Sequence, residues 1–201
     1  MIESQLIPYN LRDKINTLFL CLQTRDPITA EHSITMAEYS CKLARIFDPE
    51  FSDLYYIGSL THDIGKLAMP DHILKGNKKI KQEERKLLWQ HVRDGVMLLS
   101  ELGMPQIVID IARYHHERYN GSGYLEGLNG INIPLCGRIA AISDTYSAMI
   151  TARPYQPVKR PIEALKTLEA HEYLFDPEIL KAMIELNEAE KKQITNERAI
   201  T

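Results

Sequence analysis

Cysteine is scarce in this sequence of 201 residues, which contains only Cys21, Cys41 and Cys136. Three widely spaced thiols cannot build a disulfide framework, and none lies close enough to another to form a zinc knuckle. Such sparing use of cysteine is typical of reduced thiols in cytoplasmic proteins. The composition therefore excludes a small disulfide-stapled secreted fold, and we expect the protein to be cytoplasmic.

Long apolar runs and a large excess of one charge are also absent. No stretch approaches the roughly 20 apolar residues of a membrane span, and the N-terminal sequence lacks the basic start and apolar core of a signal peptide. The net charge is −3, which gives no reason to expect a nucleic-acid polymer or a membrane as partner. The basic segment 75–86 is an exception. It predicts either a solvated loop and helix start, the simpler reading, or a rim that attracts anions.

Sustained period-2 alternation is rare, and the apolar pattern is helical nearly throughout. One clear stripe repeats at three- and four-residue steps: Leu88, Val92, Val96, Leu99 and Leu102. Proline and glycine breaks divide the chain into about seven to nine helices. The length favours one domain. We therefore predict an all-α, single-domain helical bundle, with a polar C-terminal tail over residues 188–201 that frays.

Seven histidines are present, and several occupy positions that packing alone does not explain. His91 and His115 lie on apolar helical stripes, His32 is expected to begin a helix, and adjacent ligand types stand at 62–63 (His-Asp) and 115–116 (His-His). Each imidazole alone is compatible with a hydrogen-bonded core residue. Together they predict a cluster of imidazole and carboxylate ligands without thiolate, which suits iron or manganese and also zinc or nickel.

Asp144 is a further candidate carboxylate, in the helical segment 137–149. Small residues on nearby turns, Gly137, Ala140 and Ala141, would let this helix approach a neighbour closely. Asp144 is therefore either an exposed residue in the middle of a helix or the missing carboxylate of the histidine cluster.

Four motifs, in order and spacing, resemble the HD-GYP branch of the HD superfamily of metal-dependent phosphohydrolases: HDIGK (62–66), HHERYNGSGY (115–124), RPY (153–155) and FDP (175–177). The resemblance covers residues 10–187. It implies an N-terminal extension over 1–9, an HD-GYP-like catalytic domain over 10–187 and the polar tail over 188–201. Members of this branch are all-α and bind two or three metal ions. They hydrolyse cyclic dinucleotides, mainly cyclic di-GMP, toward pGpG and GMP.

The resemblance also implies a ligand set for two metal ions. The first ion would be held by His32, His62, Asp63 and Asp144, and the second by His91, His115 and His116. Asp63 would bridge the two ions, which explains why a carboxylate stands directly beside a ligand histidine. Two metal ions a few ångströms apart would activate water for attack on the phosphodiester.

Other matched positions would contact the substrate. Lys66 would reach the substrate phosphate, which makes Asp63 and Lys66 the expected catalytic residues. Tyr124 and Arg153 match positions that contact the ligand, and Arg118 lies close to the ligand histidines. We expect Tyr124 to stack on a guanine base from a mobile loop; a tyrosine packed in the core is the alternative.

The sequence departs from the family pattern at two places. Relatives with three metals carry a glutamate where this chain has Ile28. Isoleucine cannot ligate a metal, so we expect two divalent ions, iron or manganese, and we do not expect the neighbouring Glu31 to substitute. The Gly-Tyr-Pro tripeptide reads Gly123-Tyr124-Leu125. Leucine lacks the backbone restraint of proline, which affects loop rigidity, partner docking and substrate choice.

Three functions remain open at this point. The leading prediction is a metal-dependent phosphodiesterase acting on a cyclic dinucleotide. The second is a broader HD phosphohydrolase acting on nucleotides or linear dinucleotides. The third is a non-catalytic module that binds the dinucleotide or a protein partner, and a regulatory domain is a further possible partner.

Overall fold

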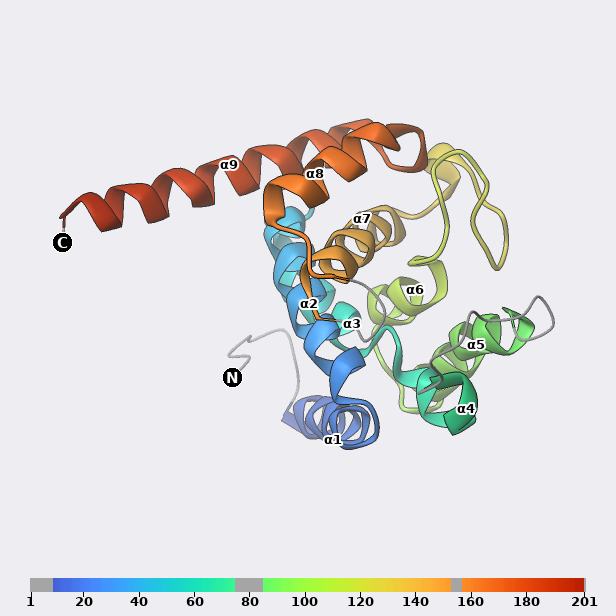
Figure 1. Cartoon of the computed structure of the whole chain (residues 1–201). Helices are drawn as coiled ribbons and strands as arrows, with labels where there is room; N and C mark the ends of the chain where they lie inside the picture. The colour runs from blue at the N-terminus through green and yellow to red at the C-terminus, as the bar shows by residue number, and fades with distance from the viewer. Residues whose placement is uncertain (1–8, 75–84, 153–156, 201) are drawn as a thin grey trace.

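The computed structural model describes residues 9–74, 85–152 and 157–200 (Figure 1), and within them every regular element is a helix. The all-α prediction is confirmed. The longer helices are α1 (Tyr9–Arg25), α2 (Pro27–Phe47), α3 (Ser52–Thr61), α5 (Arg85–Glu101), α6 (Gln106–Tyr114), α7 (Leu135–Ile150), α8 (Pro161–Ala170) and α9 (Pro177–Ile200). Short elements are η1 (Pro49–Phe51), η2 (Ile64–Ala68), α4 (Asp71–Leu74), η3 (Gly130–Asn132) and η4 (Glu172–Leu174).

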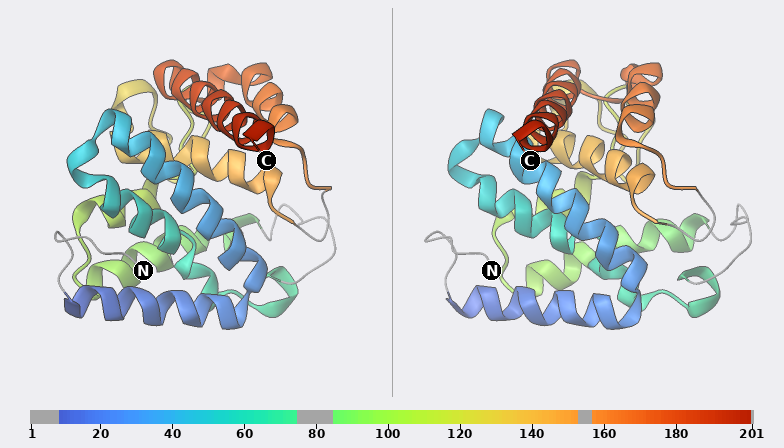
Figure 2. Two further views of the ribbon diagram at one scale, coloured as in Figure 1. Left: turned by 90° about the vertical axis from the view of Figure 1, so that its left-hand side faces the viewer. Right: turned by 60° about the vertical axis from the view of Figure 1, so that its left-hand side comes forward.

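The helices enclose two apolar cores. α1 lies at one end of the bundle and α8 with α9 at the other, with α2, α3, α6 and α7 between them (Figures 1 and 2). One core joins α2, α7, α8 and α9 and includes Leu43, Ile139 and Met183. The other joins α1, α3, α5 and α6 and includes Ile57 and Val108. Elements that carry the predicted ligands therefore converge between the two cores.

The start of α2 differs from the sequence-based expectation. Asp26 caps this helix by accepting a hydrogen bond from the Thr29 backbone N–H at 3.2 Å, and Pro27 occupies the first turn. These are favourable helix-start residues. His32 therefore lies in the second turn of α2, and the prediction that it begins the helix was wrong.

The C-terminal segment also differs from expectation. The backbone from Glu188, which we expected to fray, continues α9 as a helix to Ile200. This stretch contains no proline or glycine and is rich in the helix-favouring residues Glu, Lys and Ala. The FDP motif begins the same helix, because Asp176 accepts hydrogen bonds from the backbone N–H groups of Glu178 and Ile179 at 3.0 and 3.4 Å.

Two further features bear on the sequence-based exclusions. All three cysteines are free; Cys21 is exposed, whereas Cys41 and Cys136 are buried. Among the described residues, no helix combines the length and apolar character needed to cross a membrane.

Candidate metal centre

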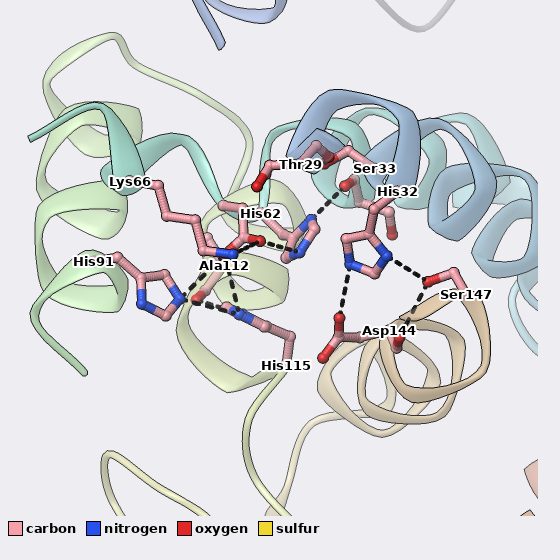
Figure 3. Close-up of polar contacts among 12 residues, drawn as sticks. Thr29, His32, Ser33, His62, Lys66, His91, Ala112, His115, Asp144 and Ser147 are labelled. Atoms are coloured by element: carbon pink, nitrogen blue, oxygen red, sulfur yellow. Dashed lines mark hydrogen bonds and ion pairs between the residues drawn. The ribbon is translucent and has the colours of Figure 1, made fainter. Parts of the chain in front are cut away.

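All seven residues expected as metal ligands lie in one region, although they come from three helices, α2, α5 and α7, and from the segments that follow two others, α3 and α6. Figure 3 shows His32 from α2 and Asp144 from α7 on one side of the site, with His91 and His115 on the other. Among the described residues, two groups have ligand atoms within 4.8 Å of one another: His32, His62 and Asp63, and His91, His115 and His116. Each group consists of residues that the resemblance assigned to one ion, and Asp144 lies near His32 and His116, one from each group.

Three imidazoles share one orienting contact, in which Nδ1 donates to the backbone carbonyl three residues earlier: His62 to Ser59 (2.7 Å), His115 to Ala112 (2.9 Å) and His91 to Leu88. A carbonyl only accepts, so Nδ1 carries the hydrogen and Nε2 presents a lone pair in the neutral ring. The Nε2 atoms of His91 and His115 lie 3.5 Å apart. Two lone pairs that face each other call for a cation between or beside them.

His32 is oriented by side chains of α7. The Ser147 hydroxyl donates to the Asp144 backbone carbonyl at 3.1 Å and therefore accepts from His32 Nδ1 at 3.1 Å. His32 Nε2 lies 3.0 Å from Asp144 Oδ1. With Nδ1 carrying the hydrogen, a neutral His32 directs a lone pair at a carboxylate, and either a proton or a metal ion must lie at that position.

Asp63 lies between the two groups of histidines. Its Oδ2 is 3.1 Å from His62 Nε2 and 2.5 Å from Lys66 Nζ. Its Oδ1 is 3.2 Å from His91 Nε2 and 4.0 Å from His115 Nε2. One carboxylate oxygen therefore faces each group, which is the arrangement that a bridging ligand requires.

Burial and charge act in opposite directions on the carboxylates. Burial raises the pKa of Asp63, but the positive charges of His62 and Lys66 outweigh it and hold the pKa well below its usual range. Burial likewise opposes ionisation of Asp144, and His32 and His116 hold its pKa well below the usual range. Both carboxylates are therefore ionised at neutral pH.

Burial has the largest effect on the pKa of the two adjacent histidines of the second group, His115 and His116. It lowers the pKa of His116 to about 3, although Asp144 opposes the shift. It also lowers the pKa of His115 well below the usual range, with His116 and His62 acting in the same direction. These rings are neutral at physiological pH, and a neutral imidazole is the form that binds a metal ion.

Unsatisfied buried atoms test whether this site suits metal ions. His62 Nε2 and Asp63 Oδ1 are buried without a hydrogen-bond partner. The contacts to neighbouring ligand atoms fall within ion-pair distance but lack hydrogen-bond alignment. An unsatisfied buried polar group costs about 1–3 kcal/mol, and a coordinated cation would satisfy both atoms. The donor set therefore fits metal binding.

The structure also describes Ile28, the position at which relatives with three metals carry a glutamate, and the neighbouring Glu31. Ile28 is 39% exposed at the start of α2 and has no ligand atom, and Glu31 is exposed. The two ligand groups found among the described residues include neither position. The number of ions stays a prediction.

The structure describes only some of the residues that are expected to contact substrate. Lys66 reaches into the cluster, where its Nζ pairs with Asp63, and its side chain is 19% exposed (Figure 3). Tyr124 stacks on His116, with ring centroids 4.5 Å apart. Arg118 donates from Nη1 to the backbone carbonyls of His115 and Glu117, so it braces this turn. Arg153 and most of the basic segment 75–86 lie outside the described residues.

Glu117, directly after the paired histidines, was not singled out from the sequence. Its fully buried carboxylate accepts backbone hydrogen bonds from Glu126 (2.8 Å), Gly127 (3.1 Å) and Leu128 (3.1 Å). This carboxylate therefore holds residues 126–128 of the loop that carries Tyr124. We expected a mobile loop there, and these bonds hold its middle section to the site.

Replacing Glu117 with alanine is expected to lower the melting temperature by about 4–12 °C, because three backbone N–H groups lose a buried, charged acceptor. Glutamine retains one oxygen acceptor and should give an intermediate value. Glu126→Ala, on the exposed side of the same loop, is the control and should change the melting temperature little. Equal melting temperatures for Glu117→Ala and Glu126→Ala would contradict the anchoring role.

Comparisons with known proteins agree with the geometry. A family model described as HD domain matches residues 16–179. A Thermotoga maritima protein named cyclic di-GMP phosphodiesterase is 38% identical over 138 residues, covering 67% of this chain and 36% of the relative. The 3'3'-cGAMP-specific phosphodiesterase 2 of Vibrio cholerae is 32% identical over 187 residues, covering 90% of this chain and 34% of the relative. The chain thus spans about a third of the length of these relatives.

A solved structure shares the fold. Bd1817, a HDG"Y"P protein from Bdellovibrio bacteriovorus, superposes with a TM-score of 0.64 at 20% sequence identity, covering 88% of this chain and 60% of that chain. At this level of identity the likeness confirms the helical architecture.

Proposed function

Because the chain belongs to the HD domain family, we propose that it is a metal-dependent phosphodiesterase that hydrolyses a cyclic dinucleotide, most readily cyclic di-GMP, to a linear dinucleotide and mononucleotide. The observation that carries this proposal is the convergence of seven candidate ligand side chains: six form two groups, Asp144 lies beside both groups, and Asp63 faces histidines of both. Relatives over 30% identical are named for cyclic di-GMP and 3'3'-cGAMP, which supports this substrate class.

We infer that the site holds two divalent ions, iron or manganese. His32, His62, Asp63 and Asp144 would hold the first, while His91, His115, His116 and the shared Asp63 would hold the second. Imidazole and carboxylate donors without thiolate favour these metals. When bound, two such ions supply positive charge at the phosphate and lower the pKa of the attacking water.

The protein side chains have separate tasks in this proposal. Lys66 holds Asp63 in its orientation through the 2.5 Å ion pair and can direct its remaining ammonium N–H groups at a phosphate oxygen. Tyr124 borders the substrate position beside His116. Arg153 is expected to pair with a phosphate through its guanidinium group.

Product analysis of the full chain tests the proposal. The protein is purified without oxygen, loaded with iron or manganese, and incubated with cyclic di-GMP, 3'3'-cGAMP, linear pGpG or simple nucleotides. Conversion of a cyclic dinucleotide to linear dinucleotide and mononucleotide is the expected result. Turnover of the linear compounds and nucleotides alone would favour the broader phosphohydrolase. Tight binding of a cyclic dinucleotide without hydrolysis by the metal-loaded protein would favour a signalling module.

Replacing Lys66 with alanine is expected to lower kcat/KM by about 10- to 1,000-fold, because it removes a charge-assisted contact to phosphate. Metal content should remain at the wild-type level, since all seven ligands are still present. Lys66→Arg keeps the positive charge and should recover part of the activity. Arg153→Ala should behave in the same way as Lys66→Ala. Loss of metal in either alanine variant would instead assign that residue to the metal shell.

A further inference from the structure

Trp89 is the sole tryptophan of the chain and lies on α5, two residues before His91. It is 40% exposed. Its indole stacks on Tyr124, with ring centroids 5.1 Å apart and an interplanar angle of 26°. Tyr124 in turn stacks on His116 at 4.5 Å and 29°. The three rings form a ladder from the protein surface to a metal-ligand candidate.

Tyr124 already has two stacking partners, His116 and Trp89. A base that stacked on Tyr124 would compete with these rings for its surface. The exposed aromatic surface at the end of the ladder belongs to Trp89.

We propose that Trp89 is the platform on which one base of the cyclic dinucleotide stacks while its phosphate lies at the histidine cluster. This inference rests on the proposed function of the same site. The bases of a dinucleotide are flat aromatic rings, and base–aromatic stacking is a frequent source of affinity for unpaired nucleotides. Lys86 lies exposed one helical turn earlier on α5 and adds positive charge near an anionic substrate.

Stacking of this kind depends on the π face that every base has, and not on hydrogen-bonding edges. Trp89 should therefore strengthen binding of guanine and adenine alike. Its loss should weaken cyclic di-GMP and 3'3'-cGAMP by similar factors, and discrimination between them must come from other residues.

Steady-state kinetics of the metal-loaded full chain tests the platform. Trp89→Ala should raise KM for cyclic di-GMP by about 5- to 100-fold, the range expected for one lost base stack. kcat should stay within about twofold, because the lost contact is made equally in the ground state and the transition state. Trp89→Phe, which keeps an aromatic face, should recover most of the loss. Met97→Ala removes a 63% exposed side chain from the same helix and should leave KM unchanged.

The fluorescence of Trp89 gives a second readout that does not depend on turnover. Cyclic di-GMP added to the wild-type protein should quench the tryptophan emission, which comes from this residue alone. An unchanged KM in Trp89→Ala, or parallel losses of kcat and bound metal, would overturn the platform, the latter by showing that Trp89 only supports the site. A wild-type protein that hydrolyses no cyclic dinucleotide would refute the proposed function, and quenching in that protein would still support the platform.

Discussion

Asp63→Ala is expected to lose both metal ions and to reduce hydrolysis of a cyclic dinucleotide by at least about 10³-fold. The reason is geometric: Asp63 Oδ1 faces His91 and Asp63 Oδ2 faces His62. Removing one carboxylate therefore takes a ligand from each group and leaves neutral imidazoles facing one another. Elemental analysis of the purified variant, beside product chromatography, measures both effects.

A matched control separates loss of the bridge from loss of a negative charge. Asp110→Ala removes a carboxylate on α6 that accepts a hydrogen bond from Gln106 at 2.8 Å, away from the ligand groups. It should retain wild-type metal content and activity. Near-normal metal content in Asp63→Ala would contradict the assignment of Asp63 as the bridging ligand, even if the variant were inactive.

Gly65→Ala is expected to disrupt the site by a different route. A Cβ on Gly65 would lie 1.9 Å from the backbone carbonyl oxygen of His91 and 2.5 Å from the backbone nitrogen of Gly95. Backbone atoms cannot rotate aside, so η2 and α5 must move apart. Overpacking costs about 1–3 kcal/mol or more, which corresponds to a melting temperature about 3–12 °C lower. The separation should also draw Asp63 away from His91 and reduce bound metal.

Gly95→Ala is the control across the same helix contact. A Cβ on Gly95 would meet Gly65 at 3.4 Å, an ordinary van der Waals distance. Alanine is also favoured over glycine inside a helix by about 1 kcal/mol. The control should match or exceed the wild-type melting temperature and keep its metal. If Gly65→Ala and Gly95→Ala behaved alike, close packing of η2 on α5 would not be what positions Asp63.

Much of the candidate site could be predicted from the sequence because its ligands lie in short local motifs. Residues 62–63 and 115–116 place ligand types side by side, and helical periodicity directs His91 and His115 inward. Small residues around Asp144 predicted close helix contact, and a Cβ on Gly137 would indeed lie 2.6 Å from Tyr114 Cβ. Local patterns of this kind can be read from the sequence because one or two helical turns determine the direction in which these side chains point.

Other features depend on contacts between distant segments. Glu117 anchors backbone groups nine to eleven residues later in a loop without periodicity. Trp89 meets Tyr124 only after α5 packs beside that loop. Ser147 was not singled out from the sequence either, although its three-residue spacing from Asp144 puts both on one helical face. The error at His32 had a local cause, since Asp26 and Pro27 together mark an earlier helix start.

The ratio of metal to protein in the chain purified without oxygen, measured by elemental analysis alongside activity, tests the two-metal site most directly. We expect two iron or manganese ions per chain, loss of hydrolysis when a chelator removes them, and recovery when either metal is restored. One bound ion or none, with no gain in metal or activity on reconstitution, would contradict a two-metal phosphodiesterase.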